Sequence, residues 1–93
     1  MGKYELTIVM DGKTSPAKRK ATQSTLEKII NATGGKVVET KEWGEKPLSY
    51  KIGKSETGYF VHFILELESP AVKAINLKLK MEEEIIRHLF IRI

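Results

Sequence analysis

The stretch that decides the fold is Tyr59-Phe60-Val61-His62-Phe63-Ile64-Leu65-Glu66-Leu67. Every second residue from Tyr59 to Leu67 is apolar, which is the period of a β-strand. The intervening positions also include apolar Phe60 and Ile64. Apolar side chains on both faces are typical of a central strand whose second face is also covered by other groups. We therefore expect a central strand over 59–67, with Phe60, His62 and Ile64 facing away from the main core.

Periodicity and turn signals divide the chain on either side of this strand. Strands are expected over 3–10, 36–52 and 85–93, and a turn over 53–58. Ser15-Pro16 and Ser69-Pro70 each combine a good N-cap with proline at the first helical position, so each should begin a helix. The first helix should end at Gly34-Gly35, because glycine suits the helix C-terminus. The second is expected from its apolar stripe of Val72, Ile75 and Leu79.

The expected strand over 36–52 is interrupted by Gly44 and Pro47. Proline has no N–H to donate to a neighbouring strand, so it is confined to edge strands and bulges. We therefore expect this strand to bulge or to lie at the edge of the sheet.

The element order β-α-β-β-α-β predicts an α+β, ferredoxin-like sandwich. It would have a four-stranded antiparallel sheet with both helices on one face, because right-handed crossovers place them there. The other face would stay open. With 93 residues, the chain should form a single domain over 1–93.

Composition narrows the classes of function. The chain has no cysteine, no apolar run long enough to span a bilayer and no signal-peptide core at its start, so we expect a cytoplasmic protein without a membrane partner. Its net charge is +4, and 13 of its 16 cationic residues are lysines. Lysine acts as a flexible point charge, so a polyanion would be bound through its phosphates.

No enzymatic site emerges from the sequence. The two histidines, His62 and His88, lack ligand spacing for a metal, and no catalytic residues, phosphate loop, cofactor site or small-molecule substrate is expected. Acylphosphatases share the topology but need an arginine soon after the first strand, and residues 10–15 contain none. RNA-recognition motifs also share it, but only Phe60 and His62 would face outward, which is a weak platform for stacking bases.

One segment resembles a known family: Trp43-Gly44-Glu45-Lys46-Pro47-Leu48-Ser49-Tyr50-Lys51-Ile52, followed by Lys54 and Gly58-Tyr59-Phe60. Together with the opening Tyr4-Glu5 and the closing Ile86-Arg87, it resembles protein six of the bacterial small ribosomal subunit. The chain departs from the family pattern at Glu45, Ser49 and Lys51, where basic, alanine and proline residues are usual. The resemblance implies a structural, non-enzymatic role: binding the central domain of small-subunit ribosomal RNA together with small-subunit protein eighteen.

These expectations give two sets of candidate residues. The RNA-binding set is Lys3, Lys46, Lys51, Lys54 and Arg87, and the resemblance supports Lys46, Lys54 and Arg87 most directly. The protein-partner set is Phe60, His62, Ile64, Leu89 and Ile91. The sequence does not decide which residues of the last strand face away from the helices, because Ile86, His88 and Phe90 form a rival set. Trp43 would either anchor the bulged hairpin or simply pack against the sheet edge.

The alternative function is a homo-oligomeric ferredoxin-like interaction or ligand-sensing module without an RNA role.

Overall fold

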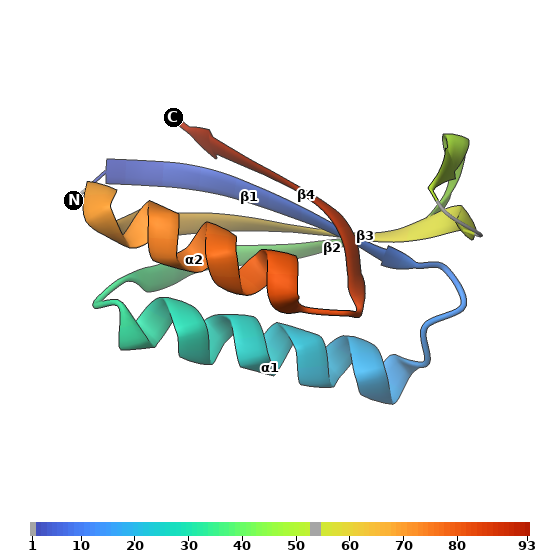
Figure 1. Ribbon diagram of the computed structural model, residues 1–93, viewed down its shortest axis with the longest axis horizontal. Helices are drawn as coiled ribbons and strands as arrows, with labels where there is room; N and C mark the ends of the chain where they lie inside the picture. Colours follow the sequence, from blue (N-terminus) through green and yellow to red (C-terminus); the bar gives the residue numbers. More distant parts are fainter. Residues whose placement is uncertain (1, 53–54) are drawn as a thin grey trace.

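A computed structural model describes residues 2–52 and 55–93. Its elements follow the expected order: β1 (Gly2–Asp11), α1 (Pro16–Ala32), β2 (Lys36–Ile52), β3 (Ser55–Leu67), α2 (Ser69–Met81) and β4 (Ile85–Arg92). The strands form one antiparallel sheet in the order β2-β3-β1-β4. Both helices lie on the same side of this sheet (Figure 1). The predicted topology is therefore confirmed.

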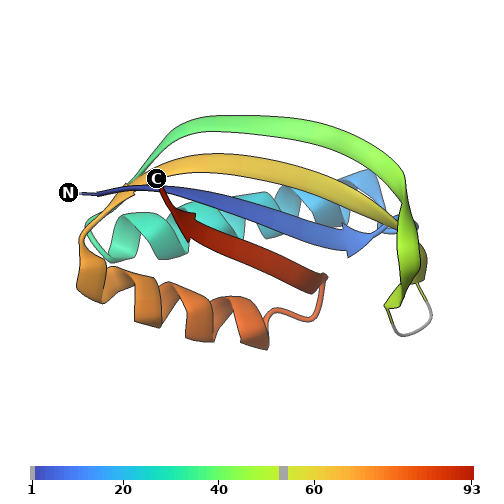
Figure 2. The ribbon, with the colours of Figure 1, turned by 90° about the horizontal axis from the view of Figure 1, so that it is seen from above.

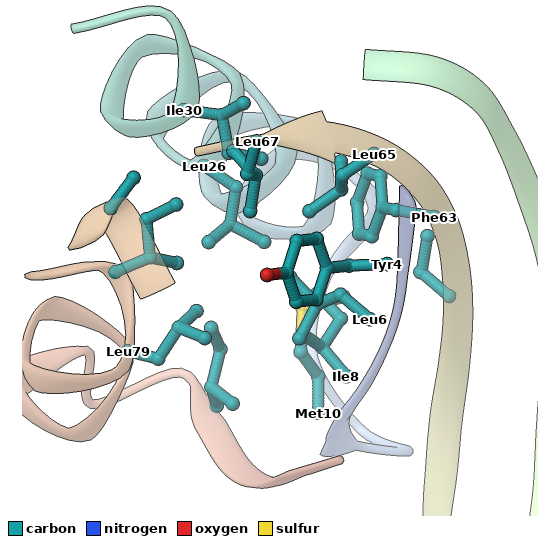
Figure 3. Close-up of a cluster of buried hydrophobic side chains, with 14 residues drawn as sticks. Tyr4, Leu6, Ile8, Met10, Leu26, Ile30, Phe63, Leu65, Leu67 and Leu79 are labelled. Carbon is teal, nitrogen blue, oxygen red and sulfur yellow. The ribbon is translucent and has the colours of Figure 1, made fainter. Parts of the chain in front are cut away.

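The core lies between the helix layer and one face of the two central strands. Leu6, Ile8 and Met10 of β1 are fully buried, as are Phe63 and Leu65 of β3. Figure 3 shows these side chains gathered with Leu26 and Ile30 of α1 and Leu79 of α2. The helices contribute one apolar stripe each, at the spacing that places side chains on one face of a helix: Leu26 and Ile30 from α1, and Ala71, Ile75 and Leu79 from α2.

The two helices begin differently, although both start with serine and proline. Ser15 caps α1, and its hydroxyl accepts a hydrogen bond from the backbone N–H of Lys18 at 3.3 Å. Ser69 does not cap α2: it is already helical, and Glu68 is the N-cap residue, with no side-chain hydrogen bond to the helix. The prediction of a serine cap was therefore wrong by one residue for α2. The predicted end of α1 is confirmed, since the N–H groups of Gly34 and Gly35 bond back to Asn31 and Ile30.

The long strand β2 lies at the edge of the sheet, as its proline predicted (Figure 2). Its pairing with β3 shifts register between Val37 and Glu39, between Glu42 and Gly44, and between Pro47 and Ile52. Gly44 has φ of +85°, a conformation that glycine adopts without the strain of a Cβ atom. The predicted turn over 53–58 was too long, because β3 already begins at Ser55; residues 53 and 54 lie outside the described residues.

His88 connects β4 to the helix layer. Its Nε2 donates a hydrogen bond to Asn76 Oδ1 of α2 at 3.1 Å. Burial lowers the pKa of His88 from its ordinary value of 6.5, and the positive charge of Lys80 lowers it further. The folded protein therefore favours the neutral imidazole at this position.

We predict that His88 makes the fold sensitive to acid. Below pH 6.5 the unfolded chain takes up a proton at His88 before the folded chain does, so the free energy of unfolding should fall as the pH drops. A His88→Gln variant removes this contribution. Denaturant unfolding between about pH 5 and 8, where histidine titrates, should give a steeper loss of stability for the wild type than for the variant. Parallel curves would contradict the prediction.

Candidate protein and RNA interface

The register of the sheet assigns each strand residue to a face. Residues directly opposite each other in an antiparallel pair share a face. Leu6 pairs with Phe63 and Ile8 with Val61, which places these residues on the core side. The alternate positions therefore line the face that no helix covers, which we call the open face. From β1 it carries Lys3, Glu5, Thr7, Val9 and Asp11, and from β3 it carries Gly58, Phe60, His62, Ile64 and Glu66.

The last strand turns Leu89 and Ile91 onto the open face. Leu89 pairs with Thr7, and Ile91 with Glu5. The rival positions lie elsewhere: His88 contacts α2, and the Phe90 ring meets the Tyr4 ring edge-on at 5.6 Å. Ile86 lies at a bulge, where the pairing with β1 shifts register. Of the two sets that the sequence left open for the last strand, Leu89 and Ile91 are therefore the residues that lie on the open face.

The open face carries exposed aliphatic side chains along its β4 edge. Leu89 and Ile91 keep 58% and 44% of their surfaces exposed, while Phe60 and Ile64 are half-buried. Aliphatic side chains this exposed at neighbouring positions are the kind of patch that marks an interaction site. All five residues of the predicted protein-partner set thus lie on one surface.

Val9 and Leu48 form a small apolar cluster around Gly58 at one end of the open face. A Cβ atom on Gly58 would lie 2.6 Å from Val9 Cγ1 and 3.1 Å from Leu48 Cδ2. Glycine is therefore required at position 58, because any side chain there would displace these neighbours. Val9 is only 7% exposed as a result. Val9 and Leu48 were not among the predicted site residues, although the alternation of the first strand puts Val9 on the same face as Glu5 and Thr7.

Four side chains form a line across β2, β3 and β1. The Trp43 ring stacks on the His62 ring, with centroids 4.9 Å apart and planes 8° from parallel. His62 Nε2 lies 3.2 Å from Glu5 Oε2. Lys46 Nζ lies 5.7 Å from the centroid of the Trp43 ring, within the range of a cation–π contact. Trp43 thus does more than pack against the edge: it links the predicted residues Lys46 and His62.

The predicted RNA-binding residues are not all brought together. Lys46 pairs with Gly58, and Arg87 pairs with Val9, so both lie toward the same end of the sheet. Lys3 lies six residues from Val9 along β1, about 20 Å away at the rise of a strand. Lys51 lies in β2, but its side chain is outside the described part of the chain, as is the whole of Lys54.

Other kinds of site find no support in the described residues. Among residues 2–52 and 55–93, no three His, Asp or Glu side chains gather in a way that could hold a metal ion. No helix within the same ranges is long and apolar enough to cross a membrane.

Comparison with known proteins gives a consistent result. The family model described as "Ribosomal protein S6" matches residues 3–92. A small ribosomal subunit protein bS6 from Alkaliphilus metalliredigens is 38% identical, over all of this chain and 98% of that protein. The bS6 protein of Acholeplasma laidlawii is 32% identical, over 99% of this chain and 97% of that protein.

A solved structure matches the fold. The crystal structure of 30S ribosomal protein S6 from Thermotoga maritima superimposes with a TM-score of 0.93, covering 99% of this chain and 87% of that one at 19% identity. This likeness supports the ferredoxin-like architecture, and the relatives support the family. The chain belongs to the ribosomal protein S6 family of the small ribosomal subunit.

Proposed function

We propose that this chain binds protein eighteen of the small subunit on its open face and, with it, the central domain of small-subunit ribosomal RNA. It would do so in the cytoplasm, as a structural constituent without catalytic activity. The observation that carries the proposal is the exposed aliphatic surface of the open face, with Leu89 58% and Ile91 44% exposed and no helix covering them (Figure 1). An apolar surface that one chain cannot cover favours a protein partner over solvent.

The arrangement of the open face fits a protein interface. Such interfaces have an apolar core and a polar rim. Here Phe60 and Ile64 of the central strand β3 and Leu89 of the edge strand β4 supply apolar surface, and Lys46 and Arg87 lie toward one end. Trp43, which stacks on His62 and is 45% exposed, offers the aromatic anchor that often dominates binding energy.

The charged end of the open face fits RNA. Lys46 and Arg87 are placed to approach the same stretch of phosphates, with the protein partner seated beside them. Contacts of this kind fix the position of a protein on RNA without reading bases. Lys51 and Lys54, which follow Lys46 along the chain, would extend this set. Lys3, at the far end of β1, would contact a different phosphate.

We predict that the open face, and not exposed leucine in general, binds protein eighteen. Leu89→Gln should weaken the complex at least tenfold, about 1.4 kcal/mol, because it places a polar group in the apolar part of the interface. Leu77→Gln is the matched control, because Leu77 is similarly exposed at 63% but lies on α2. Titration calorimetry with purified protein eighteen measures both.

Two outcomes would contradict the protein-partner proposal. Wild-type affinity in the Leu89→Gln variant would show that the partner binds elsewhere. Self-association of the wild type that Leu89→Gln abolishes, with no binding of protein eighteen, would favour the homo-oligomeric module instead. Analytical ultracentrifugation of the chain alone distinguishes this second outcome.

We predict that Lys46 and Arg87 contact phosphates. Replacing both by glutamine should weaken binding to central-domain ribosomal RNA and reduce the slope of log affinity against log salt by about 1 to 2, since each contact contributes about 0.7–0.9. A Lys46→Arg, Arg87→Lys double variant keeps both charges and should retain most of the slope. An unchanged slope in the glutamine variant would remove these residues from the RNA-binding set.

A further inference from the structure

The positive charge of this protein is concentrated in its helices. The two helices hold seven of the chain's sixteen cationic residues and one of its twelve acidic residues, Glu27. They therefore carry six net positive charges, while the rest of the sequence carries two net negative charges. The cationic residues are Lys18, Arg19, Lys20 and Lys28 on α1, and Lys73, Lys78 and Lys80 on α2.

Most of these charges face solvent without a partner. Lys18 lies 3.8 Å from Glu84, and Arg19 covers the Tyr59 ring at 4.0 Å. The remaining five are exposed, and none pairs with a carboxylate among the described residues. They are Lys20, Lys28, Lys73, Lys78 and Lys80.

The open face of the sheet differs in this respect, because three of its lysines have carboxylates nearby. Lys41 lies 3.5 Å from Glu39, and Glu66 lies opposite both Lys3 and Lys36. The two surfaces are on opposite sides of the molecule (Figure 1). The layers of such a fold are about 10 Å apart, and the Debye length at physiological salt is about 8 Å. The acidic groups of the sheet therefore screen the helix lysines only weakly. The acidic residues nearer the helices are at the two ends of α2: Glu68, Glu82, Glu83 and Glu84.

We propose that the outward face of α1 and α2 is a second RNA-binding surface, which takes the phosphate backbone of a segment other than the one at the sheet. The helices present lysines and no aromatic side chain, so they suit phosphate contact rather than base stacking. The 17 residues of α1 extend for about 25 Å, long enough to meet several phosphates. The choice of RNA as the ligand rests on the proposed function. The surface itself is identified independently, from the charges of the two helices.

RNA fits this surface better than an acidic protein does. A protein partner would need apolar anchors as well as charge. The large exposed apolar side chains of the helices are Leu77 and Met81, both near the end of α2, and α1 has none. Lysines, in contrast, extend over both helices.

The test uses four substitutions at exposed, unpaired positions: Lys20→Gln, Lys28→Gln, Lys73→Gln and Lys78→Gln in one chain. Glutamine has nearly the helix propensity of lysine, so the variant should fold, which circular dichroism checks. Binding to purified small-subunit ribosomal RNA is measured at several salt concentrations. The slope of log affinity against log salt should fall by about 3, and affinity at low salt at least tenfold. The matched control carries arginine at the same four positions and should bind like the wild type.

Three outcomes would overturn the inference. The glutamine variant could keep the wild-type slope, or the arginine variant could lose as much of it as the glutamine variant. The glutamine variant could also bind free RNA normally yet be lost from assembled small subunits, which would mark the surface as one for an acidic protein. The Lys46 and Arg87 variant separates the two proposals. If it binds RNA normally while the helix variant does not, the sheet assignment fails and the helix surface stands.

Discussion

The structure depends on one constraint: two helices can cover only one face of a four-stranded sheet. The central strand β3 nevertheless carries apolar side chains on both faces, with Phe63 and Leu65 on one and Phe60 and Ile64 on the other. The covered face holds the molecule together by burying the core. The open face keeps exposed aliphatic surface, which the folded chain alone does not remove from water. The proposed partner on that face would complete the burial that the fold begins.

The polar groups of the open face limit how a partner can sit on it. The Trp43 ring is held flat against His62, and His62 is held by Glu5, so the indole has a defined orientation before any partner arrives. A preorganised anchor loses little side-chain freedom on binding. The helix layer has the opposite character, with an excess of lysine and few exposed apolar groups. The two sides of the protein thus differ in chemistry, which is why we propose different ligands for them: a protein with RNA beside it on the open face, and RNA alone on the helices.

Much of the fold could be predicted from the sequence because its signals are local. The alternation in β3 and the Pro47 interruption in β2 each depend on a physical rule that acts within a few residues. The N-cap of α2 could not be predicted in the same way. A serine followed by proline, as in Ser69-Pro70, is compatible with serine either as the N-cap residue or as the first residue of the helix. Only the backbone distinguishes the two.

The candidate site was less predictable because it depends on register. Leu89 and His88 are equally plausible on the open face of a strand with apolar residues on both sides, and the pairing of β4 with β1 decides between them. The stacking of Trp43 on His62 follows from a bulge between Glu42 and Gly44, which no periodicity reveals. Lys3 is separated from Lys46 by the length of the sheet. The charge of the helix layer, in contrast, is readable from the sequence once the helices are placed.

The most direct test of the account uses Trp43, the only tryptophan in the chain. Its ring is 45% exposed on the open face, within the proposed protein interface. Titration with a tryptophan-free protein eighteen should shift its fluorescence emission to shorter wavelength and saturate at one partner per chain, because the partner would exclude water from the indole. A complex that forms by sedimentation while the emission of Trp43 stays unchanged would place the partner elsewhere and contradict the account.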